Sequence, residues 1–158
     1  MVVIRDFESG DENAFRELNE AWIKRYFVLE EKDIHSLEHP RETILDRGGR
    51  ILMAVEAGTP IGCCALIPVG AGEFEVAKMA VSDAFQGSGI GRRLLTETVE
   101  LARRNGARRL YLETNSRLVP AVRLYESLGF QHLAPERVTP SPYARSNVQM
   151  ELLVQPVE

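Results

Sequence analysis

Residues Val76 to Leu95 read VAKMAVSDAFQGSGIGRRLL, and this segment carries the clearest structural pattern in the sequence. Its first part is apolar, extends back to Phe74 and predicts a buried strand over residues 74–81. A glycine-rich loop, residues 86–91, follows it and leads into a segment whose apolar residues recur at helical intervals. The order strand, glycine-rich loop, helix predicts an α/β domain with this unit at its centre.

The glycine-rich loop has the composition of an anion-binding site. Glycine lets the backbone approach an anion closely, and the first turn of a helix leaves N–H groups without partners at its positive end. The string matches neither the GxxxxGK[ST] phosphate loop nor the GxGxxG dinucleotide fingerprint. From the residues alone, another kind of phosphate site and a plain helix-capping turn both stay open. Arg92 and Arg93 oppose the helix dipole in the first turn, which favours the phosphate site.

The rest of the chain predicts a mixed, mostly antiparallel sheet with helices on both faces. Ser9 and Glu12 have the spacing of a capping box for the first helix. Strand alternation puts Glu75, Ala77, Met79 and Val81 on one face of their strand. No linker or repeat is visible, so a single domain over residues 1–158 is expected. Helices are expected at residues 11–26, 30–37, 41–47, 91–104 and 119–128, and strands at residues 2–4, 51–56, 61–69, 74–81, 109–113, 130–133 and 148–154.

Two ordered motifs resemble the GNAT superfamily of N-acetyltransferases. The first is Gln-x-x-Gly-x-Gly after an apolar strand, carried by Gln86, Gly89 and Gly91. The second is AVRLYESLGF, residues 121–130, which is similar to the family helix Ala-x-x-Leu-Tyr-x-x-x-Gly-Phe. The resemblance is strong over residues 50–133 and coarse before them. It implies the GNAT-type acyl-CoA N-acyltransferase fold.

The resemblance also implies acetyl-CoA as cosubstrate. In the family, the loop amides hold the CoA pyrophosphate and the preceding strand, here residues 79–81, binds the pantetheine arm. Asn115 matches a family asparagine that contacts CoA or fixes the loop after its strand. The cofactor-binding residues that this implies are Met79, Ala80, Val81, Gln86, Gly87, Ser88, Gly89, Ile90, Gly91, Arg92 and Asn115.

Acetyl transfer from a thioester to an amine needs a base for the amine, a donor for the carbonyl oxygen and an acid for the leaving thiolate. Tyr125 matches a family tyrosine that resembles a general acid, since a phenol with a pKa of about 10 stays protonated at neutral pH; packing beneath its helix is the alternative. Glu75 resembles the position of a catalytic glutamate in protein-acetylating relatives. A solvated strand end is its alternative, and Glu113 or ordered water could then serve as the base. Backbone N–H groups near Met79 or Val81 would hold the oxygen.

Composition argues against several other classes of function. The net charge of -4 argues against a nucleic-acid partner. No apolar stretch approaches the roughly 20 residues that span a bilayer, and the N-terminus carries charge too early for a signal peptide, so no membrane partner and a cytoplasmic location are expected. Cys63 and Cys64 are adjacent and therefore point to opposite faces of a strand. Neither they nor the histidines have metal-ligand spacing, so no metal is expected.

These observations predict an N-acetyltransferase that moves an acetyl group from acetyl-CoA to the amine of a small, amino-acid-like metabolite by direct attack. Acetylation of a protein amine, a non-catalytic acyl-CoA-binding module and a homodimer stay open. Arginines in the acceptor wall would suit a carboxylate on the acceptor. The wall is expected from Trp22, Arg25, Tyr26, Glu31, Tyr143, Arg145 and Ser146.

Overall fold

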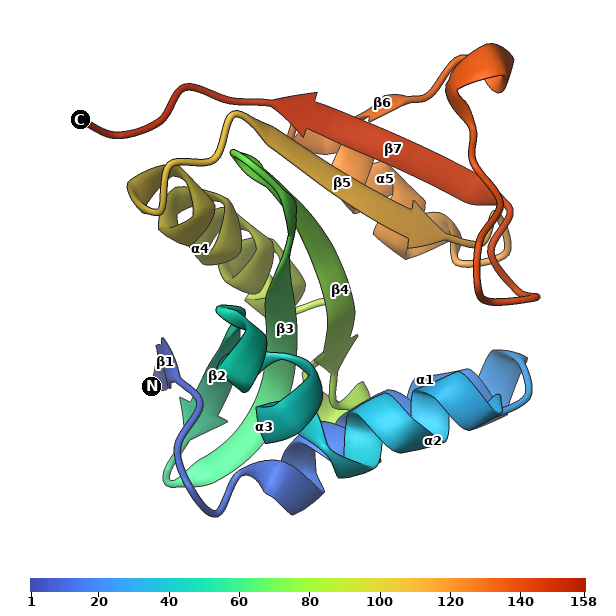
Figure 1. Cartoon of the computed structure of the whole chain (residues 1–158). Helices are drawn as coiled ribbons and strands as arrows, with labels where there is room; N and C mark the ends of the chain where they lie inside the picture. The colour runs from blue at the N-terminus through green and yellow to red at the C-terminus, as the bar shows by residue number, and fades with distance from the viewer.

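The computed structural model describes residues 1–158 and contains one seven-stranded sheet in the order β1-β2-β3-β4-β5-β7-β6 (Figure 1). Neighbouring strands are antiparallel except β4 and β5, which are parallel. The predicted α/β class with a mixed, mostly antiparallel sheet is confirmed. The strands are β1 (Val2–Asp6), β2 (Arg50–Glu56), β3 (Thr59–Gly70), β4 (Glu73–Val81), β5 (Arg109–Thr114), β6 (Gln131–His132) and β7 (Val148–Leu153), and the helices are α1 (Glu12–Tyr26), α2 (Glu31–Glu38), α3 (Pro40–Thr43), α4 (Ile90–Arg104) and α5 (Val119–Ser127), with single 3₁₀ turns η1 (Leu45–Arg47), η2 (Asp83–Phe85) and η3 (Pro135–Arg137).

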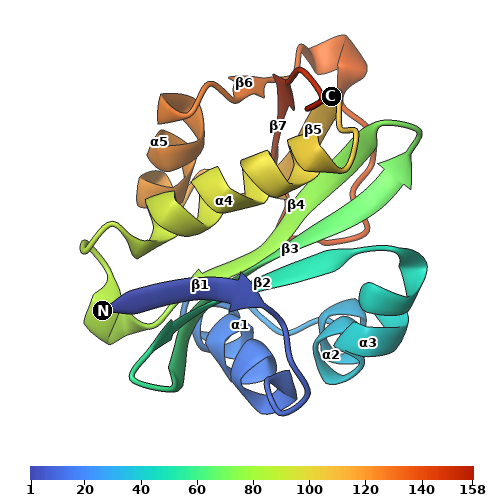
Figure 2. The ribbon, with the colours of Figure 1, turned by 90° about the vertical axis from the view of Figure 1, so that its left-hand side faces the viewer.

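Helices cover both faces of the sheet, α1 to α3 on one face and α4 with α5 on the other (Figure 2). Each face buries its own hydrophobic core. Leu94 and Leu95 of α4 are fully buried in one core, where each side chain contributes about 1.5–3 kcal/mol by leaving water. Cys63 and Cys64 of β3 lie in opposite cores, as strand alternation predicts.

The beginnings of two predicted helices differ from the expectation. The Ser9–Glu12 capping box is wrong, because α1 begins after Asp11 and the Asp11 carboxylate accepts hydrogen bonds from Arg5 and from the Glu8 N–H instead. The predicted helix over residues 41–47 is split into α3 and η1. Proline at the first position of a helix loses no hydrogen bond, so residue 40 begins α3 rather than interrupting a helix.

Strands β4 and β5 pair over only three residues and then separate. The last pair joins Glu75 to Tyr111. From Val76 onward, one edge of β4 has no partner strand, so its backbone groups face the opening between the two strands (Figure 1). This opening is the feature of the fold that creates the site.

A β-bulge interrupts β4 within this open part. Cys63 of β3 pairs with Ala80, whereas Ala65 pairs with Ala77. Between these two pairs the chain advances by three residues on β4 but by only two on β3, so β4 carries one extra residue. Lys78 lies inside the bulge with φ +54°, in the left-handed region that residues with a side chain rarely adopt.

The extra residue reverses the alternation of side chains along β4. Val76 packs in the core beneath α4, and Met79 and Val81 pack against that same core. The predicted common face for Glu75, Ala77, Met79 and Val81 is therefore wrong. Glu75 and Ala77 alternate with Val76 and face the α1 side, and the bulge moves the other two to the α4 side.

No helix of the structure has both the length and the apolar character to cross a membrane.

Candidate active site

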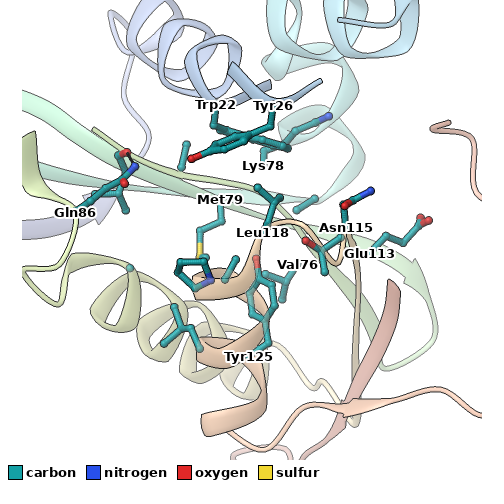
Figure 3. Close-up of a pocket in the computed structure, with 18 of the residues that line it drawn as sticks. Trp22, Tyr26, Val76, Lys78, Met79, Gln86, Glu113, Asn115, Leu118 and Tyr125 are labelled. Carbon is teal, nitrogen blue, oxygen red and sulfur yellow. Dashed lines mark hydrogen bonds between the residues drawn. The ribbon is translucent and has the colours of Figure 1, made fainter. Parts of the chain in front are cut away.

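A pocket of about 520 Å³ lies where β4 and β5 separate. The end of α1, the open edge of β4, the glycine-rich loop, the end of β5, α5 and the loop before β7 line it, and Figure 3 shows eighteen of its side chains. Tyr125 and Glu75 both line it, as do all predicted cofactor-binding residues except Ser88. The Ser88 hydroxyl instead donates to the carbonyl of Phe85.

The glycine-rich loop offers a row of unused backbone donors. The N–H groups of Gly87, Gly89, Ile90, Gly91 and Arg92 find no acceptor in the protein. Gly89 has φ +86°, and a Cβ there would meet no atom within 4 Å, so this part of the loop faces open space. Free N–H groups at the start of a fifteen-residue helix fit an anionic diphosphate such as that of CoA.

Two amide side chains fix the loops at the two ends of the pocket. The Gln86 amide donates to the carbonyl of Val81 at 3.3 Å and to the Asp83 carboxylate at 3.1 Å, which holds the loop against the end of β4. The Asn115 amide donates to the carbonyl of Arg145 at 2.7 Å and accepts from the N–H of Arg117 at 2.8 Å. Of the two predicted roles of Asn115, these contacts match the fixing of the loop after its strand.

The open edge of β4 directs backbone donors into the pocket. Ser82 donates its N–H to Ile61 at 2.8 Å, so in an antiparallel ladder the N–H of the preceding residue, Val81, points away from β3. The carbonyl of Lys78 accepts from the Cys63 thiol at 3.4 Å, and in a trans peptide the N–H of Met79 therefore points the opposite way. Both N–H groups are suited to a carbonyl oxygen bound between the strands.

Tyr125 combines burial with a free hydroxyl. The residue is 8% exposed, and its ring packs edge-on against Phe130 with the centroids 6.0 Å apart. Its hydroxyl points into the pocket toward Val76 and Leu118 (Figure 3), and no side chain or backbone group of the protein is hydrogen-bonded to it. Burial, together with the nearby Cys64 thiol, raises the pKa of Tyr125, so the phenol stays protonated and can donate.

Glu75 is a pocket carboxylate without a hydrogen bond or ion pair in the protein. Burial, followed by the negative charge of Glu113, raises the pKa of Glu75 to about 7, although Lys78 and Lys32 act in the opposite direction. A carboxylate that titrates near neutral pH can accept a proton there. Glu113 lines the same pocket but already accepts a hydrogen bond from Ser146 at 2.8 Å.

Asp33 lies behind the wall in which an acceptor is expected, and it holds Arg145 of that wall in place. No motif in the sequence points to Asp33. Asp33 is fully buried on α2 and accepts two hydrogen bonds from Arg145, at 2.7 and 2.6 Å. Burial works against its ionisation, but these bonds and the Glu30 N–H outweigh it and hold the pKa of Asp33 below its ordinary value. The Arg145 guanidinium also stacks over Trp22 and Tyr143, at 5.5 and 4.6 Å from the ring centres.

These contacts correct the expected acceptor contacts. Arg145 lines the pocket, but Asp33 already neutralises its charge, so it is not a free partner for an acceptor carboxylate. Arg25 lies outside the lining and approaches Asp83 at 3.5 Å, and Glu31 also lies outside it. Of the other residues expected in the wall, Trp22, Tyr26, Tyr143 and Ser146 line the pocket.

Two cationic residues of the pocket were missed from the sequence. Arg117 donates to the carbonyl of Tyr26 at 2.9 Å, lies 5.2 Å from the Phe27 ring centre, and has no carboxylate partner. Lys78 interrupts the apolar run of β4, and its side chain is 9% exposed. A lysine in a strand that is predicted to be buried was the signal in the sequence, because lysine is almost never fully buried unless it is paired.

The sequence profile of the acetyltransferase (GNAT) family matches residues 12–130. N-alpha-acetyltransferase RimI of Mycobacterium tuberculosis is 39% identical over 87 residues, which are 53% of this chain and 53% of that protein. The IAA acetyltransferase of Azospirillum brasilense is 38% identical over 87 residues, 54% of this chain and 57% of that protein. The matches thus span about half the length of these curated relatives.

Solved structures of low sequence identity share the fold. A GNAT-family acetyltransferase from Staphylococcus aureus superposes with a TM-score of 0.86 at 18% identity, covering 96% of this chain and 98% of that one. A Salmonella typhimurium structure that holds its cofactor acetyl-CoA has a TM-score of 0.74 at 22% identity and covers 100% and 96%. The chain belongs to the acetyltransferase (GNAT) family, so the predicted membership is confirmed.

Proposed function

We propose that this chain is an acetyl-CoA-dependent N-acetyltransferase and that its acceptor is a small, amino-acid-like amine. The observation that carries the proposal is one pocket with complementary parts. The glycine-rich loop presents free N–H groups for a diphosphate, and beyond it lie a protonated tyrosine and a carboxylate that titrates near pH 7.

Each part of the pocket has a task in the proposed reaction. Bound acetyl-CoA supplies the activated acetyl thioester. The N–H groups of Met79 and Val81 hold the carbonyl oxygen and stabilise the negative charge that grows on it. Glu75 accepts the proton of the attacking amine, directly or through water, and Tyr125 donates a proton to the leaving sulfur. Holding the amine against the thioester lowers the barrier further, because the encounter is no longer bimolecular.

One observation supports a small acceptor, and a second supports an acceptor with a carboxylate. Contacts between distant segments close the sides of the pocket: Asp33 with Arg145, and Arg117 with the end of α1 at Tyr26. The guanidinium of Arg117 lines the pocket without a carboxylate partner, so it is the group that would pair with a carboxylate on the acceptor.

A second candidate is acetylation of a protein N-terminus. The similarity to N-alpha-acetyltransferase RimI favours it, and so does Tyr26, which lines the pocket and is 37% exposed.

Initial rates of thiol release from acetyl-CoA separate the candidates. The panel consists of small amino acids, their decarboxylated amines and short peptides of matched N-terminal residues. We expect thiol release with amino acids and little release with the decarboxylated amines. Arg117→Met should abolish this preference for acceptors that carry a carboxylate. Release with peptides alone would favour protein acetylation. Acetyl-CoA-dependent thermal stabilisation without release for any amine would indicate a binding module.

A further inference from the structure

We propose that Lys78 is a positioning residue whose anchored side chain holds the β4 bulge, and thereby aims the Met79 N–H at the acetyl carbonyl. The inference rests on the proposed function, because the Met79 N–H acts on an acetyl carbonyl only in that reaction; the role of Lys78 is what the inference adds. It also links two parts of the site that are far apart in sequence, the acceptor wall and the backbone donors.

The bulge determines which backbone groups face the opening. Below it, Ala65 pairs with Ala77, and continuing that register without an extra residue would pair Cys63 with Met79 and Ile61 with Val81. Cys63 and Ile61 direct their backbone N–H and C=O groups toward β4, as the hydrogen bond from the Ser82 N–H to the Ile61 carbonyl shows. Without the bulge, the N–H groups of Met79 and Val81 would therefore be consumed by the ladder. With it, they point away from β3.

Contacts on both sides of the Lys78 backbone hold the bulge. The ammonium donates to the Tyr143 hydroxyl at 3.1 Å and lies 3.7 Å from the Asp33 carboxylate. The Lys78 side chain is 9% exposed and that of Asp33 is 0% exposed, so water competes little with this ion pair. The Lys78 carbonyl accepts from the Cys63 thiol, whose sulfur accepts in turn from the Asn19 amide at 3.4 Å.

The anchor offsets an unfavourable backbone conformation. Left-handed φ at a residue with a side chain costs free energy and persists only where surrounding contacts enforce it. Asp33, which anchors Lys78, also fixes Arg145 and the loop before β7. The acceptor wall and the bulge therefore depend on the Asp33 carboxylate. A substitution at Asp33 or Tyr143 should change the direction of the Met79 N–H, because both residues hold the Lys78 side chain.

The experiment measures the polarisation of the acetyl carbonyl directly. Wild type and the variants Lys78→Met, Lys78→Arg and Tyr143→Phe are saturated with acetyl-CoA labelled with ¹³C at the carbonyl, and the bound ¹³C shift is compared with that of free acetyl-CoA. Lys32→Met is the matched control, because Lys32 faces the same Tyr143 ring at 5.9 Å but is exposed and does not touch the bulge. Affinity for acetyl-CoA and kcat are measured for all proteins.

The proposal expects a downfield carbonyl shift in wild type, Lys78→Arg and Lys32→Met, its loss in Lys78→Met and a partial loss in Tyr143→Phe. In Lys78→Met, kcat should fall about 10- to 100-fold while the Kd for acetyl-CoA stays within about threefold, since donors of this kind act on the transition state. An unchanged carbonyl shift in folded Lys78→Met, or in Tyr143→Phe should the first variant not fold, would overturn the inference. Absence of turnover in wild type would count against the proposed function alone, because the carbonyl shift needs no acceptor.

Discussion

Replacing Glu75 by glutamine should stabilise the protein, and by an amount that grows with pH. The pKa of about 7 lies above the ordinary 4.5 because burial and Glu113 disfavour the charged form. A group whose folded pKa is raised loses its stabilising contribution as pH rises from the unfolded value through the folded one. The folded and ordinary pKa values of Glu75 differ by about 2.5, which at about 1.4 kcal/mol per pKa unit corresponds to about 3.5 kcal/mol. This is an upper figure, because solvent partly reaches the carboxylate.

Urea unfolding of wild type and Glu75→Gln at pH 5 and pH 8 tests this value. The variant should exceed wild type in unfolding free energy by about 1 kcal/mol or less at pH 5 and by about 2–3 kcal/mol at pH 8. Glu97→Gln is the control, because Glu97 lies on the exposed face of α4 and its loss should matter little at either pH. A difference between Glu75→Gln and wild type that is equal at both pH values would refute the raised pKa and, with it, the case for Glu75 as a base at neutral pH.

Three further predictions concern binding and rate. Gly89→Asp should weaken acetyl-CoA binding about 10- to 100-fold relative to Gly89→Asn in calorimetry, because a charge about 5 Å from a phosphate costs about 1–3 kcal/mol while asparagine fits the same left-handed backbone; equal affinities would remove the loop from the site. Tyr125→Phe should keep acetyl-CoA affinity and lower kcat about 10- to 1,000-fold in a thiol-release assay; an unchanged kcat would leave Tyr125 a packing residue only. Glu75→Gln should lower the rate most near pH 7 and less at high pH, where free amine is abundant; parallel rate-pH profiles would transfer the role to Glu113 or water.

The sequence was most informative where local pattern decides structure. The strand, loop and helix around Gln86 and the helix that carries Tyr125 were predicted in place, because glycine spacing and apolar periodicity are local properties. The bulge at Lys78 was missed, since a register shift depends on the partner strand β3. The ion pair of Asp33 with Arg145 was missed as well, because the fold joins residues more than a hundred positions apart. The cytoplasmic location and the homodimer stay predictions.

The proposed reaction transfers an acetyl group from acetyl-CoA to an amine. Mass spectrometry of reactions with acetyl-CoA deuterated in the acetyl group tests it most directly, with the amine panel above as acceptors. At least one small amine should gain the labelled acetyl group in a one-to-one ratio with the CoA released, and Tyr125→Phe should slow both together. Release of CoA without a labelled amine, or no release with any acceptor at saturating acetyl-CoA, would contradict it.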